Sequence, residues 1–146
     1  MMSATAILAM IDARAAIDPE FAADVAERRD APIAAALSVG RTKLVPTEIG
    51  AGTILAALGD GGGAFLDALV EIGTVNRNVY WTMDLIRQGR LRIDLPATRA
   101  GMQGLAEAVP ALAPAVQALL TLGYEPDPIA LDDVSNALNA RAKGVA

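Results

Sequence analysis

The 146-residue sequence contains no cysteine and no histidine. The absence of cysteine excludes disulfide bonds and thiol nucleophiles, and the absence of both residue types excludes the common nitrogen and sulfur ligands of zinc. Without histidine the chain also lacks the side chain that most often moves protons near neutral pH. Most enzyme mechanisms that use a thiol nucleophile or a histidine base are therefore excluded. From the residues alone we predict no catalytic, cofactor-binding or metal-binding site and no cofactor.

Long apolar runs are also missing, and aromatic residues make up only 3% of the chain. The N-terminal apolar stretch, residues 3–10, has no basic residue before it and continues into Asp12, so it lacks the pattern of a signal peptide. The longest other run, residues 111–120, is interrupted by a proline and a glutamine and is too short to span a bilayer. We expect no membrane contact and, by default, a location in the cytosol.

Positive charge is scarce overall but concentrated in one segment. The formal net charge is −5 and the pI is near 4.6, which disfavours a chain whose main task is to hold nucleic acid or an anionic membrane surface. Residues 77–99 nevertheless contain five arginines against two aspartates, whereas acids outnumber bases in residues 1–30. This segment could face nucleic acid or the acidic face of a neighbouring copy, and the few aromatic residues for base stacking favour subunit pairing or a solvated face.

Alanine is the abundant residue, with 31 copies in a chain that is 53% apolar. Alanine is the best helix former, and its short side chain lets helices approach closely. At 146 residues one core is the working assumption, so we predict a single helical domain over residues 1–146. The predicted fold class is all-α, a compact bundle of about seven to nine short helices. An alanine-rich core buries little area per residue, which suggests self-association or burial against a partner.

Capping residues, prolines and glycines divide the chain into short helical segments. The expected helices begin near Ser3, Asp18, Asp30 and Pro46, after the glycine run 59–63, near Val75 and Pro96, after Pro114, and at an N-cap at Ala130. Residues 91–95 alternate apolar and charged side chains, but a lone strand has nothing to pair with, so we interpret them as an extended connector. Pro126 and Pro128 predict a stiff linker before the last helix.

Two patterns resemble ligand sites. The glycine run 59–63 precedes a helix, where backbone amides could hold a phosphate, but no Lys-Ser/Thr pair follows it, so a flexible turn is the favoured interpretation. A divalent cation could bind to the carboxylates of Asp127, Asp132 and Asp133, yet the spacing of these residues fits no EF-hand loop. Stabilising charge at a helix N-terminus is the favoured interpretation of these acids.

The arginine-rich segment also supplies the candidate protein-contact residues, which are Tyr80, Trp81, Arg87, Arg90 and Arg92. Tyr80 and Trp81 are adjacent, so on one helix they cannot both point into a small core. One of them is either an exposed anchor at a contact or a boundary residue with its ring half covered.

Several segments resemble a group of small alanine-rich proteins encoded among the late, structural genes of tailed bacteriophages. They are Ala-Leu-Ser-Val-Gly-Arg-Thr-Lys at 36–43, Glu-Ile-Gly-Ala-Gly-Thr-Ile-Leu at 48–55, Gly-Ala-Phe-Leu-Asp at 63–67, and the ending from 125 to 138. Members more often have a serine at the last N-cap, where this chain has Ala130. The resemblance implies a non-enzymatic virion component, with its position in the head, neck, tail or fibre open.

We therefore predict a non-enzymatic virion structural protein of a tailed bacteriophage, made in the host cytoplasm and present in several copies. It would act by burying apolar helix faces and the arginine-rich segment against other virion proteins. The alternative is a small cytosolic helical adaptor or regulator that binds one host protein as a monomer. An enzyme would need a cofactor or a carboxylate pair that the sequence does not single out.

Overall fold

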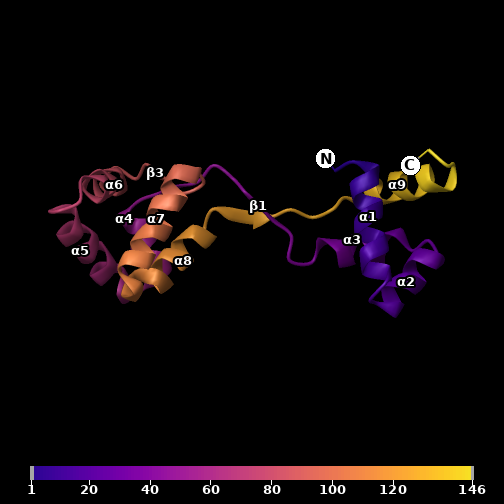
Figure 1. Cartoon of the computed structure of the whole chain (residues 1–146), viewed down its shortest axis with the longest axis horizontal. Helices are drawn as coiled ribbons and strands as arrows, with labels where there is room; N and C mark the ends of the chain where they lie inside the picture. Colours follow the sequence, from indigo (N-terminus) through magenta and orange to yellow (C-terminus); the bar gives the residue numbers. More distant parts are fainter. Residues whose placement is uncertain (1, 146) are drawn as a thin grey trace. The chain divides into compact units, whose positions relative to one another are not determined.

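The fold is all-α, as predicted, in a computed structural model that describes residues 2–145 (Figure 1). The helices are α1 (Ala4–Ala15), α2 (Pro19–Ala26), α3 (Asp30–Ser38), α4 (Ala51–Leu58), α5 (Gly61–Gly73), α6 (Arg77–Arg87), α7 (Pro96–Ala108), α8 (Ala113–Thr121) and α9 (Leu131–Ala142), with a 3-10 turn, η1, at Pro110–Leu112. The strands are β1 (Thr42–Leu44), β2 (Glu48–Ile49), β3 (Leu91–Arg92) and β4 (Tyr124–Pro126). β1 pairs with β4, and β2 pairs with β3.

The described chain forms two compact units, each with its own buried cluster. Unit 1 comprises residues 2–43 and 126–145, and unit 2 comprises residues 44–125. The assumption of one core is therefore wrong, because the apolar faces of α1, α2, α3 and α9 pack on one another and those of α4 to α8 form a second cluster. The domain assignment itself, a single helical domain over residues 1–146, stays a prediction.

Unit 1 begins its helices as the capping residues predict. Ser3 Oγ accepts a hydrogen bond from the Ala6 backbone N–H at 3.2 Å, and Asp18 Oδ1 accepts one from Phe21 N–H at 3.1 Å. The predicted N-cap of α9 at Ala130 is confirmed, although its side chain has no oxygen to offer. Ile129 and Val134, which flank that cap, are both buried, as expected of a hydrophobic staple.

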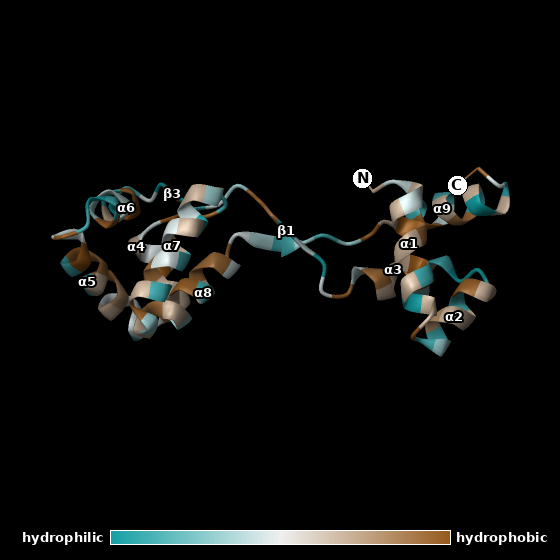
Figure 2. Cartoon of the chain, viewed as in Figure 1, coloured by the Kyte–Doolittle hydropathy of each residue, from teal (hydrophilic) through white to brown (hydrophobic). Residues whose placement is uncertain are grey.

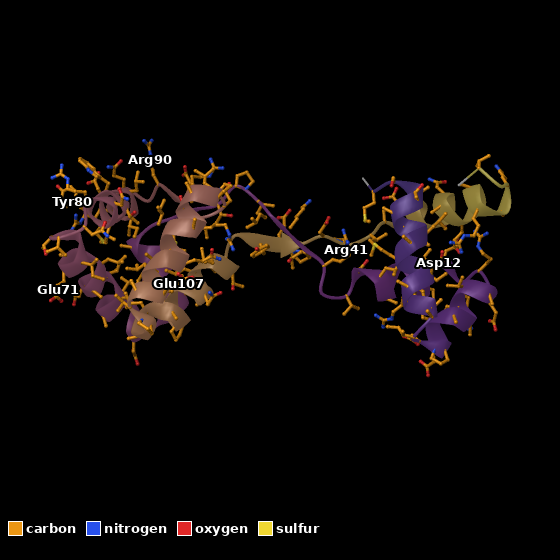
Figure 3. The ribbon with its side chains drawn as sticks, viewed as in Figure 1. Asp12, Arg41, Glu71, Tyr80, Arg90 and Glu107 are labelled. Carbon is orange, nitrogen blue, oxygen red and sulfur yellow. The ribbon has the colours of Figure 1, made fainter. Side chains whose placement is uncertain are left out.

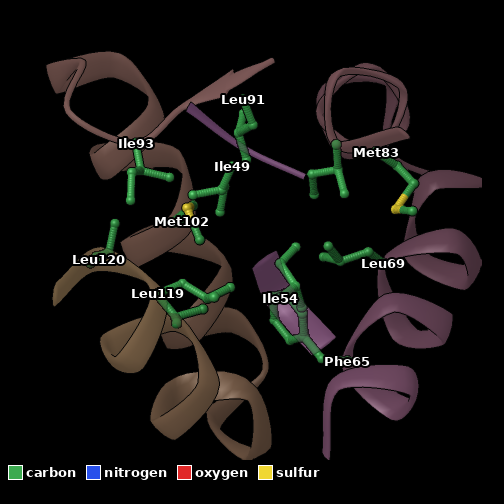
Figure 4. Close-up of a cluster of buried hydrophobic side chains, with 12 residues drawn as sticks. Ile49, Ile54, Phe65, Leu69, Met83, Leu91, Ile93, Met102, Leu119 and Leu120 are labelled. Carbon is green, nitrogen blue, oxygen red and sulfur yellow. The ribbon is translucent and has the colours of Figure 1, made fainter. Parts of the chain in front are cut away.

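Unit 2 has a core to which every helix from α4 to α8 contributes (Figure 4). Its buried side chains are Ile49, Ile54, Phe65, Leu69, Met83, Ile86, Leu91, Ile93, Met102, Val116, Leu119 and Leu120. Nine of these twelve side chains are isoleucine, leucine or valine and the others are two methionines and one phenylalanine, so the core of unit 2 depends mainly on close packing of branched residues.

The interpretation of residues 91–95 as an unpaired connector is wrong. Leu91 and Arg92 form β3, which pairs antiparallel with β2, Ile49 opposite Leu91 and Glu48 opposite Arg92. The helix expected from Pro46 accordingly begins later, at Ala51, because Glu48 and Ile49 are extended. Pairing buries Ile49, Leu91 and the following Ile93 in one core, and that gain overrides the local helix signal.

The glycine run 59–63 is mostly helix rather than a loop. Gly61, Gly62 and Gly63 form the first turn of α5, and Gly62 is buried. A Cβ on Gly62 would lie 2.9 Å from the Leu55 Cα, so its lack of a side chain allows α5 to pass close to α4. Packing between two helices therefore accounts for this glycine without a phosphate.

Candidate protein-contact site

The candidate contact residues lie on and just after α6. Asn76 is the N-cap of this helix, and its Oδ1 accepts a hydrogen bond from Val79 N–H at 3.2 Å. Gly89, with φ +70°, adopts the left-handed conformation that ends the helix. Met83 and Ile86 turn into the core of unit 2 and Val79 packs against it, so the opposite face of α6 is open to solvent.

Tyr80 and Trp81 both lie outside the core, whereas their adjacency predicts only that they cannot both lie inside it. Tyr80 is 50% exposed and Trp81, the single tryptophan of the chain, is 54% exposed. Their rings meet edge to face, with centroids 5.1 Å apart and planes at 89°. A large ring held by a neighbour loses little entropy on binding, which is the property of aromatic anchors at protein interfaces.

Arg77, Arg87 and Arg90 have no ion pair and no side-chain hydrogen bond within residues 2–145. Figure 3 shows Arg90 extending away from the ribbon beyond the end of α6. Three solvated guanidinium groups thus stand around one helix in unit 2. Guanidinium groups that are free in this way can bind carboxylates with paired hydrogen bonds.

Arg92 differs from the other candidate residues, because its side chain is used inside unit 2. Its Nε and Nη2 donate to Asp94 Oδ1 and Oδ2 at 2.7 and 2.6 Å, and Thr47 N–H donates to Asp94 Oδ1 at 3.0 Å. The Arg92 guanidinium, and secondly the Thr47 amide, hold the pKa of Asp94 well below its ordinary value. This pair fastens the residues after β3 to those before β2.

A groove of about 540 Å³ runs between α6 and α7. Its walls include Trp81 and Leu85 of α6 and Ile72 of α5. The Leu85 side chain is 40% exposed. The α7 side consists mainly of small residues, among them Ala97, Gly101, Gly104 and Ala108. α7 is pale along much of its length in Figure 2, because small residues have intermediate hydropathy.

The two glycines of this groove have no packing role within residues 2–145. A Cβ built on Gly101 or on Gly104 meets no atom within 4 Å. A glycine inside a helix costs roughly 0.5–1 kcal/mol relative to alanine. Packing within unit 2 therefore does not explain why α7 contains Gly101 and Gly104. Glycines on an exposed helix face are typical of a surface that another backbone approaches closely.

A second groove, of about 380 Å³, lies on the other flank of α6, against α5. Leu69, Val70 and Met83 supply its apolar lining, and Tyr80 stands on its α6 side. Arg77 and Arg87 also line this groove. The groove therefore combines an apolar floor with two free positive charges.

The remaining motifs serve structure. Asp132 and Asp133 lie in the first turn of α9, whereas Asp127 pairs with Arg41 at 3.1 Å. The Ser38 hydroxyl donates to Ala34 O at 2.6 Å and accepts from Ile129 N–H at 2.9 Å, and Ser135 donates to Asp30. Within residues 2–145, no group of three acidic side chains is arranged to hold a metal ion, and no helix has the length and apolar composition needed to cross a bilayer.

Comparison with protein-family models, curated proteins and solved structures produced no match. The candidate contact site is therefore described by its geometry alone.

Sequence reasoning selected Tyr80, Trp81, Arg87 and Arg90 but missed the two grooves beside them. The spacing of Gly101 and Gly104, with alanines at 97 and 108, is a signal that was available in the sequence. It places four small residues on one face of a helix. Only the fold shows that this face lies opposite Trp81 rather than in the core.

Proposed function

We propose that this protein is a non-enzymatic structural component of a tailed bacteriophage virion, made in the host cytoplasm and working through contacts with other virion proteins. The observation that carries the proposal is the groove between α6 and α7, where the half-exposed Trp81 stands over the small residues of α7. The likeness of residues 36–43, 48–55 and 63–67 to late-gene phage proteins supports the virion setting.

The partner that fits this groove is a helix with an apolar stripe. The floor at Gly101 and Gly104 is open, which allows a helix backbone to approach closely. Trp81 and Leu85 would pack against its apolar side chains and lose their exposure to water. Carboxylates beside the stripe would meet the solvated Arg90.

The test is whether the chain is found in particles. Virions purified on a density gradient, from a phage that encodes the chain, are quantified by immunoblot. We expect the wild-type chain in the particle fraction at a constant copy number. Replacement Gly104→Leu fills the groove, and we expect it to reduce incorporation about thirtyfold, since blocking a central contact costs on the order of 2 kcal/mol.

Gly52→Leu is the matched control. Gly52 lies in α4, where a Cβ also meets no atom within 4 Å, and it lines neither groove. The control should enter particles as the wild type does. A chain that stays wholly in the soluble lysate as a one-to-one complex with a host protein would overturn the proposal and support the adaptor alternative.

A further inference from the structure

The two units differ in how their arginines pair with acidic side chains. In unit 1 each of the five arginines forms an ion pair within the chain. The pairs are Arg14–Asp18, Arg28–Asp30, Arg29 with Asp24 and Glu27, Arg41–Asp127 and Arg141–Asp12. In unit 2, by contrast, three acids on or next to α5 and two arginines of α6 form no ion pair within residues 2–145.

Three unpaired acids form an acidic ridge along α5: Asp60, the N-cap residue before the helix, and Asp67 and Glu71 within it. All three are exposed, and none forms an ion pair or a side-chain hydrogen bond within residues 2–145. They recur at intervals of seven and four residues, so they share one face of the helix, away from the buried Phe65 and Leu69. Figure 3 shows Glu71 pointing outward from α5.

The unpaired arginines of α6 match this ridge in length. Arg77 and Arg87 are ten residues apart, about 15 Å along a helix, and Asp60 and Glu71 are eleven apart, about 16 Å. Both arginines line the groove between α5 and α6, with Tyr80 between them. The acidic ridge and the arginine groove are therefore complementary in charge and similar in length.

We propose that a second copy of this chain occupies the groove between α5 and α6, with its α5 ridge paired to Arg77 and Arg87. This inference rests on the proposed function. It supplies one of the contacts by which several copies would assemble. Each copy carries both surfaces, so two copies can exchange the contact reciprocally, which is the arrangement of a two-fold interface.

Small residues make the approach of the second α5 sterically possible. Gly63 and Ala64 lie on the ridge between Asp60 and Asp67, and both are exposed. A Cβ on Gly63 would meet no atom within 4 Å, so this glycine too has no packing role in its own unit. In the second copy it leaves room for the Tyr80 ring, while Val70 in the groove loses contact with water.

The first experiment measures the mass of the purified full chain by size-exclusion chromatography with light scattering, at two salt concentrations. We expect a dimer in low salt that shifts toward the 15.0 kDa monomer in high salt, because exposed ion pairs are screened. A monomer of 15.0 kDa at high protein concentration in low salt would overturn the inference.

Charge reversal then tests the pairing itself. The double replacement Arg77→Glu with Arg87→Glu places acids on both surfaces, and Asp67→Arg with Glu71→Arg places bases on both. Each variant alone should associate at least tenfold more weakly than the wild type. An equimolar mixture of the two should regain dimers, since each acidic surface then meets a basic one. A mixture that remains monomeric, or single variants that dimerise like the wild type, would overturn the inference.

Glu107→Arg with Asp132→Arg is the matched control for the rise in net charge that Asp67→Arg with Glu71→Arg produces. Both side chains are exposed, lie off α5 and α6, and have no ion pair within residues 2–145. This variant should dimerise as the wild type does. Circular dichroism melts of every variant separate lost association from lost folding.

Two further results separate this inference from the proposed function. A monomer in solution that still enters purified particles would overturn only the contact between copies. A salt-sensitive dimer that is absent from particles would overturn only the virion role. Salt-sensitive retention of a monomeric chain on duplex DNA, abolished by the arginine replacements, would show that Arg77 and Arg87 bind phosphate and would overturn the inference.

Discussion

The carboxylate of Asp94 shows how one residue joins segments that are distant in sequence. It accepts two hydrogen bonds from Arg92 and one from the Thr47 backbone N–H, and its side chain keeps only 11% of its exposure. The segments joined are those that precede β2 and follow β3. The charge of this aspartate is therefore part of the packing of unit 2.

We expect Asp94→Asn to lower the free energy of unfolding near neutral pH. The pKa of Asp94 in the folded chain lies below its ordinary value of 3.8, so its stabilisation is present above that pH and is lost as the pH falls toward the folded value. The difference between wild type and variant should therefore shrink as the pH falls below 3.8. Urea unfolding followed by circular dichroism at several pH values measures it, and a difference that stays constant below that pH would contradict the assignment.

A second residue-scale prediction separates surface from core. Trp81 is 54% exposed whereas Ile54 is fully buried. We expect Ile54→Ala to cost about 2–5 kcal/mol, because it leaves a cavity in the core. Trp81→Ala should cost about 1 kcal/mol or less and should reduce incorporation into particles far more than it reduces stability. Urea unfolding followed by circular dichroism measures both; similar losses would place Trp81 in the core.

At the scale of elements, most helices follow their local signals, and the exceptions have a tertiary cause. α1, α2 and α3 begin at or next to the predicted residues, and Gly89 ends α6, because caps and glycines act on the nearest turn of backbone. α4 and β3 were misassigned, because the partner strands are separated by more than forty residues. Local propensity carries no information on such a pairing.

Replacing glycine by alanine should change the free energy of unfolding in opposite directions in α5 and α7. Gly104→Ala should raise the free energy of unfolding by about 0.4–1 kcal/mol, since its Cβ enters open space and the unfolded chain loses freedom. Gly62→Ala should lower it by about 1–3 kcal/mol, because the new Cβ would lie 2.9 Å from the Leu55 Cα. Denaturant unfolding compares them, and effects of the same sign would contradict the packing described.

At the scale of the whole molecule, the chain has two buried clusters rather than one. Unit 1 is built from both ends of the sequence, residues 2–43 and 126–145, and unit 2 from the middle. The chain passes from one unit to the other at residues 43–44 and 125–126. Each unit is small, so a mutation in one core removes a large share of that unit's stability.

We expect a core mutation to destabilise the unit in which it lies. Trp81 belongs to unit 2, so its fluorescence follows that unit, whereas far-UV circular dichroism follows the helices of both. Ile11→Ala, in the cluster of unit 1, should shift part of the dichroism transition to lower denaturant and leave the fluorescence midpoint unchanged. Ile54→Ala should shift the fluorescence midpoint. Equal shifts of both signals by both variants would show a single cooperative unit.

The sequence by itself determined that this protein is helical, where most of its helices begin, and that Tyr80 and Trp81 cannot both be core residues. These properties depend on backbone preferences and on spacing within a few residues. Only the tertiary structure decided that there are two cores, that residues 48–49 pair with 91–92, and that Trp81 faces the glycines of α7. Those outcomes arise from contacts between distant segments, whose free energy depends on mutual burial and shape rather than on any local pattern.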